Sequence, residues 1–133
     1  MIALQWWMRL VGLFYVALCV GALARQPIRA EGPPGVLEKA AAGDPTARFV
    51  IDTWVALGLL LGVIGAVLIF CSREANDARA LVKTVIAIEL LWGIPVDVYK
   101  MARGYKKPML VAFIVIHFVI SLTGLFALGR GRG

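Results

Sequence analysis

The chain has 133 residues, of which 61% are hydrophobic, and its mean hydropathy is +0.86. A soluble domain of this length carries about 45–50% apolar residues, so the excess predicts a membrane protein and excludes a soluble domain of catalytic size. The net charge is +6, but the basic residues cluster between apolar blocks, which is typical of helix-end anchors or headgroup contacts and not of a nucleic-acid-binding face.

Four segments are apolar enough to cross about 30 Å of hydrocarbon, which takes about 20 helical residues. They are residues 2–23, 49–70, 81–99 and 109–128, with an extramembrane loop at 24–48. We therefore expect an all-α fold, an integral membrane four-helix bundle in which residues 1–133 form a single transmembrane domain.

The first segment has some features of a secretory signal peptide, since Ala22-Leu23-Ala24 resembles a cleavage site for a signal peptidase. Its start, however, is apolar and rich in tryptophan, and Arg9 lies well inside the segment. We expect a retained membrane helix. The loop that follows is rich in proline and reads as irregular, with a short helix around 36–42 where alanine, Glu38 and Lys39 favour one.

The third segment carries charged residues, and Pro95 is expected to interrupt its hydrogen-bond ladder. Gly104 ends this helix and Pro108 suits the first turn of the next one. Four spans place both chain ends on one side of the membrane. Basic residues divide almost evenly between the two sides, so the positive-inside rule leaves the orientation open, and we expect cytoplasmic ends.

Ionisable residues inside the spans are the most informative ones, because a charge at the centre of a membrane helix costs about 2.5–3.5 kcal/mol and normally turns toward a partner. At 1.5 Å per residue, Arg9 and Glu89 lie about 10 and 12 Å below the same surface. His117 and Tyr15 lie deeper, near the midplane, and Ser121 shares a helix face with His117. We therefore expect polar groups from three segments to meet inside the bundle.

The central hypothesis is a buried polar cluster of Glu89, His117 and Arg9, with Asp97 and Asp52 at one mouth. The full candidate set for a ligand-binding site or polar core is Arg9, Tyr15, Glu89, Trp92, Asp97, His117 and Ser121. Among the tryptophans, Trp92 is expected to line the interior, and the others to anchor helices at the membrane surface.

A purely structural role remains open for the same residues. Arg9 can extend to the membrane surface, and Glu89 can be a neutral hydrogen-bonding group. For Asp52 and Asp97 we favour an interfacial position, with Asp52 paired to Arg48 one turn earlier.

Several chemistries are disfavoured by the residues present. One histidine provides at most one haem ligand of that type, and the possible metal ligands are spread along the helix axes, so no metal and no cofactor are predicted. Motifs for nucleotide binding, zinc proteases and serine hydrolases do not occur in the sequence. Cys19 and Cys71 lack the spacing of a redox or disulfide motif and are expected to pack as small apolar residues.

Four stretches resemble the BphX-like family of small bacterial four-helix membrane proteins, which lies near the DoxX-like families. They are the segment QWWMRLVGLFY at 5–15, Glu89-x-x-Trp92-Gly93-x-x-x-Asp97, Arg103-Gly104-Tyr105, and Ile116-His117-x-x-Ile120-x-x-Thr123-Gly124. The resemblance spans nearly the whole chain. It implies the four-helix fold, a multi-pass location in the bacterial inner membrane, and importance for Arg9, Glu89, Asp97 and His117.

The resemblance implies no reaction. The BphX-like family has no established activity and is named for an association with operons of aromatic degradation, and DoxX-like relatives are linked to quinol oxidases and redox-associated complexes. We expect an accessory subunit of a larger membrane complex, or a component that binds a quinone or another apolar molecule. The expected partners are membrane lipids and either a larger membrane complex or further copies of this chain in a homo-oligomer. The alternatives are a membrane enzyme that transfers protons at Glu89 and His117 on a lipidic substrate, and a small proton-coupled transporter.

Overall fold

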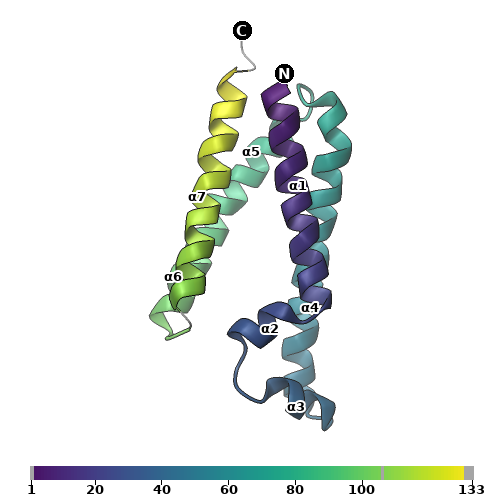
Figure 1. Ribbon diagram of the computed structural model, residues 1–133, viewed down its shortest axis with the longest axis vertical. Helices are drawn as coiled ribbons and strands as arrows, with labels where there is room; N and C mark the ends of the chain where they lie inside the picture. The colour runs from purple at the N-terminus through teal and green to yellow at the C-terminus, as the bar shows by residue number, and fades with distance from the viewer. Residues whose placement is uncertain (1, 106, 131–133) are drawn as a thin grey trace. The chain divides into compact units, whose positions relative to one another are not determined.

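The computed structural model describes residues 2–105 and 107–130, and all regular structure in them is helical (Figure 1). The elements are α1 (Ile2–Leu23), α2 (Gln26–Glu31), α3 (Val36–Ala41), α4 (Pro45–Cys71), the 3-10 turn η1 (Ser72–Glu74), α5 (Arg79–Ile88), the π-helical turn η2 (Glu89–Gly93), α6 (Ile94–Ala102) and α7 (Lys107–Arg130). The all-α prediction is confirmed for these residues.

Three helical stretches are long and apolar enough to cross a membrane, which suggests a membrane protein. They are Ala3–Leu23, Pro45–Glu74 and Pro108–Arg130. The expected third span, 81–99, is not among them. Its residues are divided among α5, η2 and α6, and Lys83, Glu89 and Asp97 lower its hydropathy.

The chain forms two compact units, which we describe separately. The terminal unit combines the start of α1, through Val11, with the chain from Leu68 onward. The central unit is Gly12–Val67, with the rest of α1, the short helices α2 and α3, and most of α4.

Glycines bring the two long helices of the central unit into close contact. A Cβ atom on Gly62 would lie 2.7 Å from Cys19 Sγ, and one on Gly65 would lie 2.5 Å from the carbonyl oxygen of Gly12. A Cβ on Gly58 would collide with Ala22 Cβ. Only glycine permits this backbone approach, which is how apolar helices pack tightly without a hydrophobic driving force.

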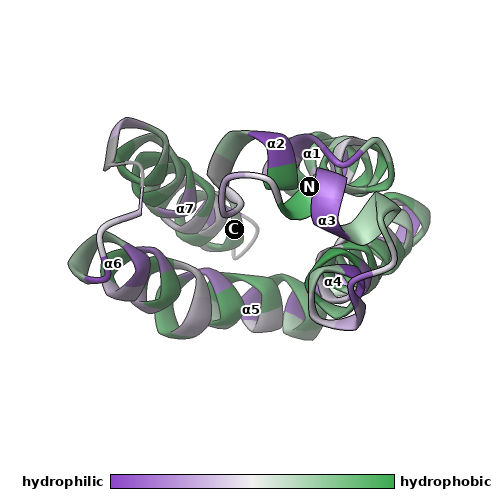
Figure 2. Cartoon of the chain, turned by 90° about the horizontal axis from the view of Figure 1, so that it is seen from below, coloured by the Kyte–Doolittle hydropathy of each residue, from purple (hydrophilic) through white to green (hydrophobic). Residues whose placement is uncertain are grey.

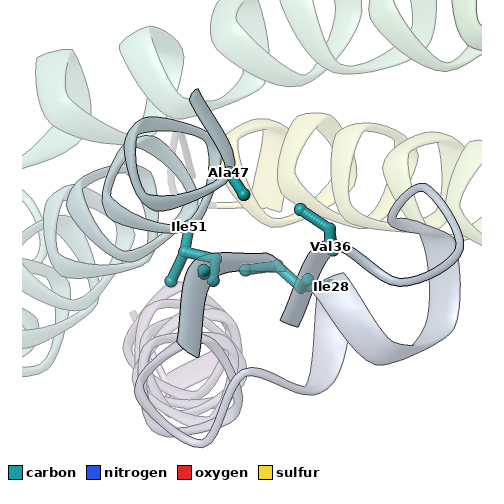
Figure 3. Packing of buried hydrophobic residues seen from close by; sticks show 5 residues of the cluster. Ile28, Val36, Ala47 and Ile51 are labelled. Carbon is teal, nitrogen blue, oxygen red and sulfur yellow. The ribbon is translucent and has the colours of Figure 1, made fainter. Parts of the chain in front are cut away.

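Residues 24–48 are more ordered than the irregular loop expected from the prolines. The short helix expected around 36–42 is present as α3, and α2 precedes it. Apolar side chains of α2, α3 and the start of α4 are buried together and hold both short helices in place (Figure 3). This cluster consists of Ile28, Val36, Ala40, Ala47 and Ile51.

Helix α4 begins at Pro45, four residues before the expected boundary at 49. Asp44 explains the early start, because its Oδ1 accepts a hydrogen bond of 2.7 Å from the backbone N–H of Ala47. Proline fits the first position of a helix, since its missing N–H would have no partner there. Arg48 then donates from Nε to the carbonyl oxygen of Ala40 at 3.1 Å and ties α4 to α3.

In the terminal unit, α7 packs along α5, η2 and α6 (Figure 1). Hydrophilic residues interrupt α5 and α6, whereas α7 is hydrophobic over most of its length (Figure 2). The start of α1 joins them through Trp7, whose Nε1 donates to Ile120 O at 3.2 Å and to Thr123 Oγ1 at 3.1 Å. A Cβ on Gly124 would lie 2.8 Å from Trp7 Cζ2, so this glycine makes room for the indole.

Candidate functional site

The terminal unit holds one imidazole between two carboxylates. His117 of α7 forms a hydrogen bond through Nδ1 with Glu89 Oε2 of η2. Its other ring nitrogen, Nε2, lies 3.2 Å from Asp97 Oδ2 of α6. The side chains are 18% exposed for His117, 4% for Glu89 and 9% for Asp97. We call these three residues the acid–imidazole–acid cluster.

The two contacts of the imidazole differ in quality. The contact with Glu89 has the geometry of a hydrogen bond. Asp97 Oδ2 is close enough to Nε2 for an ion pair, but it lies outside hydrogen-bond geometry and has no other hydrogen-bond partner among the described residues. Asp97 is therefore the more loosely held acid, and its buried oxygen is free to accept another donor.

Gly93 makes room for the imidazole between the two acids. A Cβ at this position would lie 2.6 Å from His117 Cε1 and 2.7 Å from Nδ1. These distances are far below van der Waals contact, so the ring rests directly on the glycine backbone. Any larger residue at 93 would push the ring away from its partners.

This arrangement can store and move protons. A neutral imidazole donates from one nitrogen and accepts at the other, so both contacts are satisfied only when the cluster holds at least two protons. A proton that passes from the Glu89 carboxyl to Nδ1 can be matched by release of the Nε2 proton to Asp97. The net result is the transfer of one proton from one acid to the other, with the ring returned to a neutral form.

The structure distributes the other predicted residues differently. Arg9 is directed to η1, where its Nε donates to Ser72 Oγ at 3.2 Å, and its guanidinium lies 5.6 Å from the Trp6 ring centre. Trp92 is 45% exposed, in contrast to the interior position expected for it. Residues three apart share a face in an ordinary α-helix, so the widened turn between Glu89 and Trp92 accounts for the outward position of the indole.

Ser121 is buried at 1% exposure, and its hydroxyl has no hydrogen-bond partner among the described residues. Tyr15 is buried in the central unit, where its Cβ lies 3.0 Å from the position of a Cβ on Gly65. Asp52 is exposed on α4, and the interfacial position favoured for it stays a prediction. Asp97 is buried against His117, and the interfacial position expected for it stays a prediction.

Sequence reasoning does not identify Ser72, Gly93 or the π turn. Ser72 Oγ donates to Ile69 O at 2.7 Å and accepts from Arg9, so it satisfies two groups at the end of α4. Gly93 follows Glu89 by four residues and Pro95 follows shortly after, which together are a signal for a local distortion of the helix. Across residues 2–105 and 107–130, no three His, Cys, Asp or Glu side chains are arranged to hold a metal ion.

Comparison with known proteins gives a consistent family match. The family described as BphX-like matches residues 1–132. An uncharacterized BphX-like protein of Burkholderia cepacia is 34% identical over 120 residues, which cover 88% of this chain and 84% of the relative. An uncharacterized BphX-like protein of Paraburkholderia xenovorans (strain LB400) matches with the same identity and coverage. No solved structure matches the chain.

Proposed function

Since the chain belongs to the BphX-like family, and the two relatives above are themselves described as uncharacterized, we propose a function from the geometry of the site. The protein is a four-span membrane protein that binds the polar head of an apolar molecule, of the quinone or lipid class, at the acid–imidazole–acid cluster. The observation that carries this proposal is the burial of Glu89, His117 and Asp97 against one another.

The fourth span of this proposal is the segment formed by α5, η2 and α6. Residues 79–102 are about 36 Å long at 1.5 Å per residue, enough to cross the hydrocarbon core. Glu89 and Asp97 face His117 and not lipid, which lowers the cost of placing their charges in the membrane. Together with the three apolar helices, this segment supports a four-helix membrane bundle. The bacterial sources of the two relatives support an inner-membrane location.

Three buried polar side-chain atoms in the terminal unit have no hydrogen-bond partner among the described residues. Two of them, Asp97 Oδ2 and Ser121 Oγ, support a ligand, and the third is Arg79 Nη1. Unpaired buried polar atoms cost about 1–3 kcal/mol each, so a ligand or water that satisfies one of them gains that amount. The hydroxyl of a quinol or lipid head can donate to Asp97 Oδ2, and a quinone carbonyl can accept from Ser121 Oγ. The apolar part of either molecule would remain in the bilayer.

The same geometry favours a second candidate, an enzyme that transfers protons on a lipidic substrate. Ligand binding alone needs one hydrogen-bonding group, whereas here both nitrogens of His117 contact carboxylates. In this candidate Glu89 acts as the acid or base, and His117 passes the proton to or from Asp97. Either role is compatible with the protein acting as an accessory component of a larger membrane complex.

The proposal is tested by measuring ligand retention and binding in nanodiscs. Wild-type protein and Asp97→Asn are extracted gently, and co-purified small molecules are identified by mass spectrometry. Decylubiquinone and decylubiquinol are then titrated separately while the tryptophan fluorescence is followed. Loss of the charge-assisted hydrogen bond from a quinol hydroxyl to Asp97 Oδ2, of about 1.5–3 kcal/mol, predicts a dissociation constant for decylubiquinol raised about 10- to 100-fold in Asp97→Asn.

Asp52→Asn provides the matched control, because it removes an exposed carboxylate from an apolar helix outside the cluster. It is expected to bind as the wild type does. Failure of decylubiquinone to bind, with a lipid retained only by wild-type protein, would select the lipid class. Equal retention and equal binding by all three proteins would exclude the cluster as a ligand site.

A further inference from the structure

The π turn η2 lies between the two acids of the cluster. Eight positions separate Glu89 from Asp97. In a regular α-helix, eight positions at 3.6 residues per turn leave two residues about 80° apart around the axis, on different faces. A single imidazole would then contact one of the acids but not the other.

The extra residue of the π turn changes this register. The backbone N–H of Ile94 donates to the carbonyl oxygen of Glu89, an i to i+5 bond. A π turn accommodates one more residue than an α turn, so eight positions take the place of seven. Seven positions bring two residues within about 20° of the same face. Glu89 and Asp97 therefore lie two turns apart on one line, and His117 reaches both.

Two residues favour the distortion at this place. Pro95 has no N–H for an α-helical bond to the carbonyl of Leu91, and its ring would collide with that carbonyl in a regular helix. Gly93 permits the His117 ring to lie on its backbone. We infer that Gly93 and Pro95 are positioning residues, which hold the π turn so that one imidazole is clamped by two acids from the same helical segment.

The inference concerns the same site as the proposed function, but its test needs no ligand, so the two can fail separately. His117 is the only histidine of the chain, and its ring nitrogens give assignable resonances in ¹⁵N-histidine-labelled protein. In the wild-type background, Glu89→Gln and Asp97→Asn should each shift these resonances. Each response then reports one contact of the ring.

Deletion of Leu91, which is exposed, is combined with Pro95→Ala. The variant lacks both the extra residue and the ring that opposes a regular helix, so it leaves an α-helix with seven positions between the acids. The protein should fold, and His117 should still respond to both Glu89→Gln and Asp97→Asn. Loss of either response, or failure of this chain to fold, would overturn the inference. In an ordinary helix a deletion of one residue turns everything beyond it by about 100°.

Deletion of Ala87 is the matched control, because this exposed residue lies in α5 just before the turn. This deletion is also made with Pro95→Ala, so that the π turn can close to an α turn. Residues from Gly93 onward then keep their places, whereas Glu89 shifts by one position and turns by about 100°. His117 should keep its response to Asp97→Asn and lose its response to Glu89→Gln. A full Glu89→Gln response in the Ala87 deletion would show that register does not place this acid, and would overturn the inference.

Gly93→Ala tests the contact with the ring, and Gly129→Ala is its control because a Cβ on Gly129 meets no atom within 4 Å. Gly93→Ala should shift the His117 resonances and weaken the responses to both acid substitutions. Gly129→Ala should leave them unchanged. Identical spectra for the two variants would exclude Gly93 as a positioning residue.

Discussion

At the scale of single residues, the cluster reconciles ionisable side chains with an apolar surrounding. An isolated buried charge costs several kcal/mol, and attraction between neighbours repays this only with good geometry. Glu89 and His117 meet in a direct hydrogen bond, while Asp97 completes the second side of the ring. A buried group of this kind gives weak support to stability, which is why the proposed function assigns it a binding or proton-transfer role.

This reasoning predicts an asymmetry between single and double substitutions of Glu89 and His117 by leucine. Glu89→Leu leaves the imidazole without its hydrogen-bond partner and should lower the free energy of unfolding by about 3–5 kcal/mol. Replacing both residues by leucine should restore part of this loss, because neither member of the Glu89–His117 pair is left behind, whereas Asp97 keeps a buried carboxyl without the imidazole. Denaturation in detergent, followed by circular dichroism, measures both values. Additive losses would mean that the two side chains do not share an interaction.

At the scale of helices, the sequence predicts which long helices form better than it predicts where they begin or where they widen. Apolar length predicts the long helices, and α1 covers the same residues as the first expected segment. Hydropathy places the start of α4 too late, because the N-terminal turn of this helix is polar and is set by Asp44. A fixed period of 3.6 residues across Pro95 cannot predict the π turn, which holds one residue more.

In the candidate site, too, the sequence predicts some contacts and misses others. The cost of intramembrane charge predicts that Glu89 and His117 meet, and the two side chains are directly paired. Depth alone groups Arg9 with them, but depth does not determine direction around a helix. Arg9 instead contacts Ser72, in a 3-10 turn that no hydropathy pattern indicates.

The start of α4 provides a prediction at this scale. Asp44→Ala removes the acceptor for the Ala47 N–H and should destabilise the first turn by about 1 kcal/mol. Amide hydrogen exchange in residues 45–50 should then be about fivefold faster. Asp44→Asn keeps a side-chain oxygen that can accept the bond and should exchange as the wild type does. Equal exchange in the alanine and asparagine variants would exclude capping by Asp44.

At the scale of the whole molecule, large apolar side chains remain exposed on every long helix. Examples are Leu13 on α1, Phe70 on α4, and Val119 and Leu122 on α7. Exposed apolar surface of this extent is costly in water and favourable in lipid. The remaining question at this scale is the number of membrane crossings, because α5, η2 and α6 carry the charges that a simple hydropathy criterion rejects.

The number of crossings can be determined from the sides of the membrane on which the two chain ends lie. With four spans the two ends of this chain lie on one side of the membrane, whereas with three they lie on opposite sides. We expect both ends in the cytoplasm. Green fluorescent protein fused at either end should therefore fluoresce, and alkaline phosphatase fused after Gly104 should be active.

In the proposed four-span arrangement, the pairing of Glu89 and Asp97 with His117 lowers the cost of inserting their segment. His117→Leu leaves both acids without this partner and should shift part of the population to three crossings. The C-terminal fusion would then lose fluorescence while the N-terminal fusion keeps it. Phe118→Leu on the same helix alters an exposed side chain outside the cluster and should leave both signals unchanged. Opposite locations of the two ends in the wild-type protein would eliminate the four-span arrangement.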